Sequence, residues 1–205
     1  MNYNEFINTY QKVPFEKYAN AVIKAPVVSV CVQTYNHVNY IKECLDGILM
    51  QETDFDYEIL LGEDASSDGT REICIAYAKR YPKKIKLFLH RRENNMVIGG
   101  RPTGRFNFMN NLYAAKGKYI AICEGDDYWT NANKLQKQVD FLEEHKDYAL
   151  SFHEVLVRSN EPSKDGLLLC RNLTKKTYQL GDFADGNFIP TCSVVFYRQQ
   201  LPPVD

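Results

Sequence analysis

Residues 27–62 read VVSVCVQTYNHVNYIKECLDGILMQETDFDYEILLG, and this stretch decides the fold class of the chain. It opens with a nearly continuous apolar, β-branched run at residues 27–33, which is typical of a strand covered on both faces. Apolar residues then recur at helical spacing from Ile41 to Leu49, and a second apolar run follows at residues 57–62. A strand, an amphipathic helix and a second strand predict a parallel βαβ unit.

The same alternation continues along the chain and predicts an α/β fold with a mostly parallel central sheet and helices on both faces. A loop rich in glycine, arginine and asparagine interrupts it at residues 91–105. The further expected elements are a helix at 70–80, a strand at 85–89, a helix that ends at Lys116 with Gly117 as its C-cap, a strand at 119–123, a helix at 134–145 and a strand at 148–157.

The bulk composition favours one domain and weighs against several kinds of partner. The 205 residues are 44% hydrophobic, which is enough for a sizeable core. Twenty-five basic and 26 acidic residues give a net charge of −1, so no electrostatic argument favours nucleic acid. The first 18 residues lack the pattern of a signal peptide, and no apolar run approaches the length of a membrane span. We therefore expect a cytoplasmic protein, and peripheral contact with the inner face of a membrane stays open.

The cysteines form no CxxC pair, and most fall within apolar periodic segments. This distribution predicts buried thiols in a reducing compartment rather than a disulfide framework. His37 and His153 have no metal-ligand spacing, so a zinc site is not expected. The cysteines are Cys31, Cys44, Cys74, Cys123, Cys170 and Cys192.

Polar residues that follow the first strand are candidates for ligand binding, because open parallel sheets bind ligands at the carboxyl ends of their strands. The first strand ends in Gln33-Thr34-Tyr35-Asn36. Tyr35 at this edge is suited to stack on a nucleobase. The alternative is a helix-capping turn, with Asn36 or Asn39 as the N-cap.

The second strand runs directly into a dense series of acceptors, residues 63–70. Carboxylates next to buried apolar residues are costly unless they meet donors or a cation. We predict that Asp64 accepts from the imide N–H of uracil or from ribose hydroxyls, whereas Asp68 or Ser67 is better explained as a helix cap.

The fourth strand is followed by Glu124, Asp126 and Asp127. Carboxylates this close repel one another unless something neutralises them, and a hard cation such as Mg²⁺ or Mn²⁺ does so. An acidic turn before the next helix is the alternative. In the glycine-containing loop, Arg101 and Arg105 are candidates for binding a diphosphate, and a solvated surface loop is the alternative for each.

Three segments in this order resemble the family 2 glycosyltransferases. They are VSVCVQTYN, EILLGEDASSDGT, and AAKGKYIAICEGDDYW with KLQKQVDFLEEH after it. The resemblance runs from about Val27 to His145 and more loosely to Phe196. It implies a GT-A nucleotide-binding fold and inverting transfer of a sugar from a nucleoside diphosphate to an acceptor hydroxyl, with Mn²⁺ or Mg²⁺ as the cofactor.

By position, the resemblance makes Gln33 and Tyr35 the base-contacting pair and Asp64 the acid that reads the base. It assigns Asp126 and Asp127 to ribose and metal. Glu124 stands where the family usually has aspartate, and Ala65 stands where it usually has glycine. The interpretation of Asp64 as a uracil-binding acid favours a UDP-sugar as the donor, and the expected acceptor is a glycan or a lipid-linked molecule.

The resemblance also implies a catalytic base in an acidic motif beyond Val195, and there the chain offers only Asp205. We therefore expect an N-terminal helical extension at residues 1–26 and a GT-A domain at residues 27–205 whose C-terminal part is incomplete. Glu154 and Asp182 are conceivable substitutes for the base. The alternative functions are a nucleotide-sugar-binding module without transfer activity and a nucleotidyltransferase.

Overall fold

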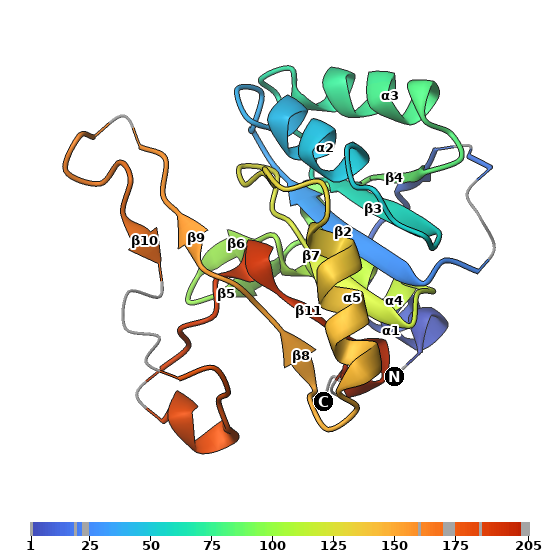
Figure 1. Cartoon of the computed structure of the whole chain (residues 1–205). Coiled ribbons are helices and arrows are strands. Elements are labelled where there is room, and N and C mark those ends of the chain that lie inside the picture. Colours follow the sequence, from blue (N-terminus) through green and yellow to red (C-terminus); the bar gives the residue numbers. More distant parts are fainter. Residues whose placement is uncertain are drawn as a thin grey trace.

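The computed structural model of the chain describes residues 2–18, 20–21, 25–159, 161–169, 175–184 and 186–201. Within these residues a seven-stranded sheet forms the centre of the molecule (Figure 1). Its strands are β1 (Glu16–Lys17), β2 (Val28–Thr34), β3 (Tyr57–Glu63), β4 (Ile85–Leu89), β7 (Tyr119–Ile122), β8 (Leu150–Ser151) and β11 (Val195–Tyr197).

The strand order across the sheet is β1-β4-β3-β2-β7-β11-β8. The four inner strands β4, β3, β2 and β7 are parallel, with Val28 opposite both Tyr57 and Tyr119. The edges are antiparallel, because β1 pairs with β4 in this sense and β11 does so with both β7 and β8. The sheet is therefore mostly parallel, as predicted.

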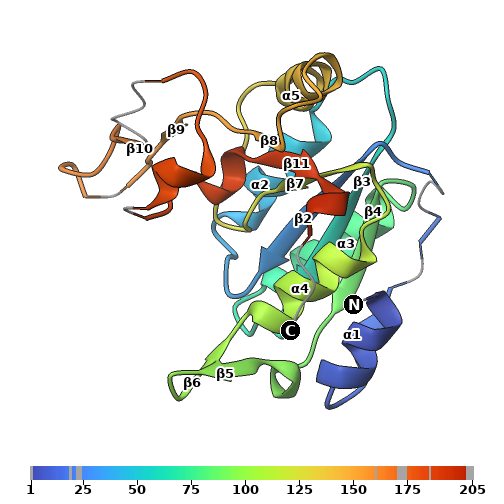
Figure 2. The same ribbon diagram turned by 90° about the horizontal axis from the view of Figure 1, so that it is seen from below.

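Helices cover both faces of the sheet, which confirms the predicted fold class (Figures 1 and 2). One buried cluster joins one face to α2, α3 and α5, and a second joins the opposite face to α4, against which α1 packs. The helices are α1 (Tyr3–Tyr10), α2 (Ile41–Leu49), α3 (Thr70–Arg80), α4 (Arg105–Ala114) and α5 (Lys134–Glu144).

The continuous apolar character of β2 follows from this layering. Val30 and Val32 belong to the cluster under α2, α3 and α5, whereas Cys31 between them belongs to the cluster under α4. Successive side chains of a strand point to opposite faces, so a strand covered on both sides requires apolar residues at every position.

Two small hairpins extend from the carboxyl-end edge of the sheet, on either side of it (Figure 2). The first hairpin, β5 (Met96–Ile98) with β6 (Arg101–Thr103), lies in the stretch expected to be an irregular loop and follows the single turn η1 (Arg92–Asn94). The second hairpin is β9 (Val155–Leu156) with β10 (Leu168–Leu169). It precedes three further short turns, η2 (Leu180–Phe183), η3 (Thr191–Ser193) and η4 (Arg198–Gln200).

Two predicted elements are wrong in detail. The strand expected at residues 148–157 is two short strands, because β8 pairs with β11 and β9 with β10. The helix expected to reach Lys116 ends at Ala114, and Gly117 is not its C-cap. A Cβ at Gly117 would lie 2.5 Å from the backbone nitrogen of Ser29, so this glycine permits close approach to β2.

The first 26 residues contribute a helix and an edge strand. Phe6 of α1 is fully buried and stacks on Phe106 of α4 with ring centroids 5.2 Å apart. β1 then pairs with β4 through Glu16 and Lys17. The predicted extension therefore packs against the sheet and one of its covering helices.

Five cysteines have buried free thiols, as the sequence predicts, and Cys170 lies outside the described residues. Burial raises the pKa of Cys31, Cys74 and Cys192, which leaves these thiols uncharged at neutral pH. Among the helices that the structure describes, none combines the length and hydropathy needed to cross a bilayer.

Candidate functional site

The predicted site residues after β2 lie at the carboxyl edge of the sheet. Gln33 donates its side-chain amide to Glu124 Oε1 at 3.0 Å, so these two candidates contact each other. Tyr35 is 39% exposed, and the guanidinium of Arg92 lies 3.9 Å from the centre of its ring. One face of the Tyr35 ring is therefore covered by a cation, and this contact restrains the orientation of the ring.

Asn36 does not cap a helix. α2 begins at Ile41 without a side-chain capping bond, so the alternative of Asn36 or Asn39 as N-cap is wrong. Asn36 instead has φ of 54°, donates its backbone N–H to Ser66 Oγ at 2.9 Å, and accepts from the backbone N–H of Ser67 at 3.1 Å. The loop after β2 is thereby tied to the loop after β3.

Asp64 is buried and makes two hydrogen bonds through one carboxylate oxygen. Oδ2 accepts from Arg92 Nη1 at 2.6 Å and from Asn95 Nδ2 at 3.0 Å. Oδ1 is also buried and has no partner among the described residues. Burial raises the pKa of Asp64, and Asn95 and Arg92 partly offset this effect. Oδ1 of Asp64 could therefore accept a hydrogen bond from a ligand.

The neighbouring acids of this loop have structural partners. Glu63 is fully buried, pairs with the Arg71 guanidinium, and accepts from the backbone N–H of Ser66 at 2.6 Å. Asp68 accepts from the backbone N–H groups of Thr70 and Val38, each at 3.0 Å. The N-cap of α3 is Gly69, so the prediction of Asp68 or Ser67 as the cap is wrong, although Asp68 does bond the first residue of the helix.

The acids after β7 meet the end of β2 because a glycine lies between them. A Cβ at Gly125 would be 2.5 Å from Thr34 Oγ1 and 2.8 Å from His37 Nδ1. Asp126 is half exposed, with Oδ2 3.9 Å from His37 Nε2. The third acid, Glu124, accepts the Gln33 amide described above.

Asp127 has the most perturbed carboxylate of this group. Burial, together with the negative charges of Asp126 and Glu124, raises the pKa of Asp127 to about 6. Within the described residues no three His, Cys, Asp or Glu side chains are close enough to enclose an ion by themselves. One or two carboxylates together with diphosphate oxygens suit Mg²⁺ or Mn²⁺, so Asp126 and Asp127 fit an ion whose other ligands come from a nucleotide.

Among the described residues, no hydrogen bond or ion pair joins these acids to the two arginines predicted to bind diphosphate. Arg101 begins β6 and is exposed, and Arg105 is the exposed first residue of α4. Sequence reasoning missed Arg92, which contacts both Tyr35 and Asp64. Arg92 follows β4 by three residues, so the strand-end rule points to its loop but does not distinguish it from the other arginines there.

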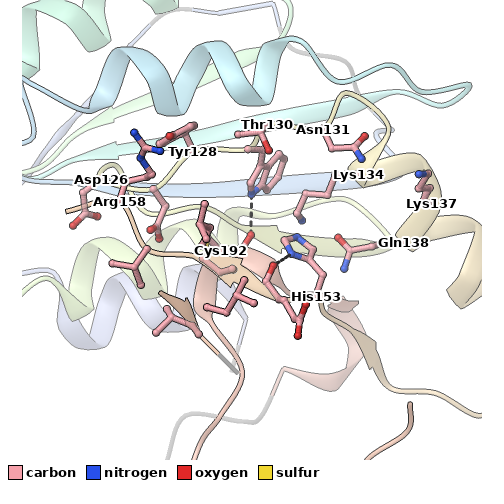
Figure 3. Close-up of a pocket in the computed structure, with 18 residues that line it drawn as sticks. Asp126, Tyr128, Thr130, Asn131, Lys134, Lys137, Gln138, His153, Arg158 and Cys192 are labelled. Atoms are coloured by element: carbon pink, nitrogen blue, oxygen red, sulfur yellow. Dashed lines mark hydrogen bonds between the residues drawn. The ribbon is translucent and has the colours of Figure 1, made fainter. Parts of the chain in front are cut away.

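A cavity of about 900 Å³ opens beside Asp126 and Asp127 (Figure 3). Trp129 forms part of its wall and donates its indole N–H to the carbonyl of Cys192 at 2.8 Å. Glu154, one of the two conceivable bases, lines this cavity. The other, Asp182, accepts from Lys175 at 2.6 Å, and Asp205 lies outside the described residues.

Comparison with known proteins decides the family. Residues 29–199 match the model of the glycosyl transferase family 2. The chain belongs to this family. This assignment agrees with the tyrosine and the carboxylates that the fold gathers at one sheet edge.

Relatives and solved structures agree with the family assignment. The uncharacterized Mycobacterium tuberculosis protein Rv1520 is 38% identical over 172 residues, which are 84% of this chain and 47% of the relative. The chain thus spans about half the length of this relative. S. aureus TarS in complex with UDP superimposes with a TM-score of 0.55 at 18% identity, over 83% of this chain and 46% of TarS.

A further structural neighbour was solved with both a nucleotide sugar and a metal ion. The mannosyltransferase PcManGT from Pyrobaculum calidifontis, in complex with GDP-Man and Mn²⁺, has a TM-score of 0.50 at 24% identity. The matched region covers 72% of this chain and 40% of that protein. At these identities the two structures show that the fold of this chain is that of GT-A glycosyltransferases.

Proposed function

We propose that this chain binds a nucleoside diphosphate sugar, with uridine as the base, at the carboxyl edge of its sheet. The observation that carries the proposal is Asp64, whose Oδ2 is held by Arg92 and Asn95 while its Oδ1 is buried without a partner among the described residues. The imide N–H of uracil is a donor of the kind that this oxygen lacks. Tyr35, fixed beneath Arg92, offers its other face to the base.

The diphosphate would lie beside Asp126 and Asp127, with a divalent ion between its phosphate oxygens and these two carboxylates. The TarS complex contains UDP, and the PcManGT complex contains GDP-Man and Mn²⁺. Both complexes support the proposal of a nucleotide and a metal ion in this chain. Such an ion supplies charge that stabilises the leaving diphosphate. Asp126 and Asp127 hold it in place, and Gly125 keeps their loop against the end of β2.

The reaction that we propose for the whole protein is inverting transfer of the sugar to an acceptor hydroxyl of a glycan or a lipid-linked molecule. A carboxylate that takes the proton of the acceptor hydroxyl is required for this chemistry. Glu154 lines the same cavity as Asp126 and Asp127. A lipid-linked acceptor would bring the protein to a membrane surface.

Calorimetric titration with UDP, CDP and GDP, each with Mn²⁺ or with EDTA, tests the nucleotide proposal. We expect UDP with Mn²⁺ to bind best and Asp127→Asn to remove the effect of the ion. Tyr35→Ala should cost about 1–3 kcal/mol of UDP binding if the ring stacks on the base. Tyr40→Ala is the matched control, because Tyr40 is also exposed and lies in the same connection. Equal affinity for the three nucleotides, or equal loss in the two tyrosine variants, would contradict the proposal.

A further inference from the structure

The cavity beside the metal acids contains a buried lysine at its opposite end. Lys134 is 6% exposed, and its side chain points into the cavity with Gln138 and His153 beside it, whereas Asp126 lies at the other end (Figure 3). The ammonium lies 4.0 Å from the centre of the Trp129 ring. It has no hydrogen-bond partner among the residues that the structure describes.

Among the residues that the structure describes, no carboxylate forms an ion pair with Lys134. Burial lowers its pKa to about 7, and the groups that oppose this effect are the thiols of Cys123 and Cys192. Both thiols have raised pKa values and carry no charge at neutral pH. Burial also lowers the pKa of His153, and Lys134 adds to that effect, so His153 is uncharged at neutral pH and Lys134 is the group that can carry a positive charge at this end of the cavity. An unpaired ammonium in such a place is costly, and an anion from a ligand would relieve the cost.

We propose that Lys134 binds an oxyanion, a carboxylate or a phosphate, carried by a sugar in this cavity. The inference rests on the proposed function for the position of the sugar beside the diphosphate. The two ends of the cavity then bind different parts of the ligand. Asp126 and Asp127 act at the diphosphate, and Lys134 selects an acidic sugar over a neutral one through charge-assisted hydrogen bonds.

The structure offers a matched control for this lysine. Lys137 lies on the same helix and lines the same cavity, but its side chain is exposed. Lys134→Met removes the charge and keeps an unbranched apolar stem against Trp129, whereas Lys134→Arg keeps the charge. Thermal melts and UDP titrations of each variant report whether its fold and its nucleotide site are intact.

The test measures binding of glucuronate, glucose 6-phosphate and glucose by NMR titration, with the protein loaded with UDP and Mn²⁺ and also free. UDP-glucuronate and UDP-glucose are compared in parallel, which shows whether the oxyanion belongs to the donor or to a second sugar. For at least one acidic ligand we expect affinity about 10- to 100-fold above its neutral counterpart, the range of charge-assisted hydrogen bonds. Lys134→Met should abolish this preference, and Lys134→Arg and Lys137→Met should retain it.

The proposal is overturned if every acidic ligand binds no better than its neutral counterpart. It is equally overturned if Lys134→Met keeps the preference while its melting temperature changes, because the lysine then has only a structural role against Trp129. Failure of the proposed function looks different. In that case UDP does not bind the wild-type protein, while a preference for acidic sugars in the free protein would still assign the oxyanion to Lys134.

Discussion

The contact between Arg92 and Asp64 gives the sharpest prediction about stability. Replacing Arg92 by methionine leaves a buried carboxylate whose remaining hydrogen bond at Oδ2 comes from Asn95. Removal of one partner of a fully buried ion pair costs about 3–5 kcal/mol. The Arg92 side chain is 34% exposed, and the Asn95 bond remains, so we expect a loss of about 2 kcal/mol, below that range.

A double-mutant cycle in urea isolates this interaction from lost packing. In an Asp64→Asn background no buried charge remains at position 64, and Arg92→Met should then cost only about 0.5 kcal/mol, which gives a coupling of roughly 1.5 kcal/mol. Arg91→Met is the control, since Arg91 is the exposed neighbour in sequence and should change stability by less than about 0.5 kcal/mol. An equal cost of Arg92→Met in both backgrounds would refute the pairing argument.

The same variant has a predictable dependence on pH. Burial raises the pKa of Asp64, and loss of Arg92 should raise it further. A carboxyl with a raised folded-state pKa binds protons that the unfolded chain has released, so stability falls as pH rises through this range. The penalty of Arg92→Met should therefore be smaller at pH 5 than at pH 7, and a pH-independent penalty would count against a buried charge as its cause.

Two further substitutions probe packing and a buried histidine. Gly125→Ala places a methyl group 2.5 Å from Thr34 Oγ1 and should destabilise by about 1–3 kcal/mol in thermal unfolding, whereas Gly104→Ala meets no atom within 4 Å and should have little effect. Burial lowers the pKa of His90 to about 3. Below pH 6.5 the unfolded state therefore binds a proton at His90 that the folded state does not bind, and the free energy of unfolding decreases as the pH is lowered. His90→Phe should flatten this fall between pH 6.5 and 4, and parallel curves for variant and wild type would show that His90 does not cause it.

The fold was predictable from sequence where the hydrophobic pattern has one interpretation. The strands and helices from Val28 to Arg80 match their expected ranges within a residue, because strands covered on both faces and amphipathic helices leave distinct periodicities. Gly117 was misassigned because its close approach to Ser29 is a contact across 88 residues of chain. Nothing in the local sequence distinguishes such a glycine from a helix cap.

The candidate site was predictable in its carboxylates but not in its cation. Asp64 directly follows β3 and Asp127 lies in the turn five residues after β7, so the strand-end rule places both at one edge. Arg92 stands in a loop with several other arginines, and only the turn η1 brings its guanidinium onto Tyr35 and Asp64. Which arginine of a loop reaches a site depends on backbone geometry that the composition of the loop does not encode.

The two halves of the site differ in how firmly the protein holds them before a ligand binds. On the nucleotide side, hydrogen bonds join the loop after β2 to the loop after β3, among them His37 to Thr70 at 2.8 Å and Val38 to Asp68 at 3.0 Å. On the sugar side, one wall of the cavity is β9 and β10, two-residue strands that pair with each other outside the central sheet. Preorganised groups lose less entropy on binding, so under the proposed function the nucleotide side would supply most of the affinity. Selectivity among sugars would then depend on the few fixed polar groups of the cavity, of which Lys134 on α5 is the most deeply buried basic side chain.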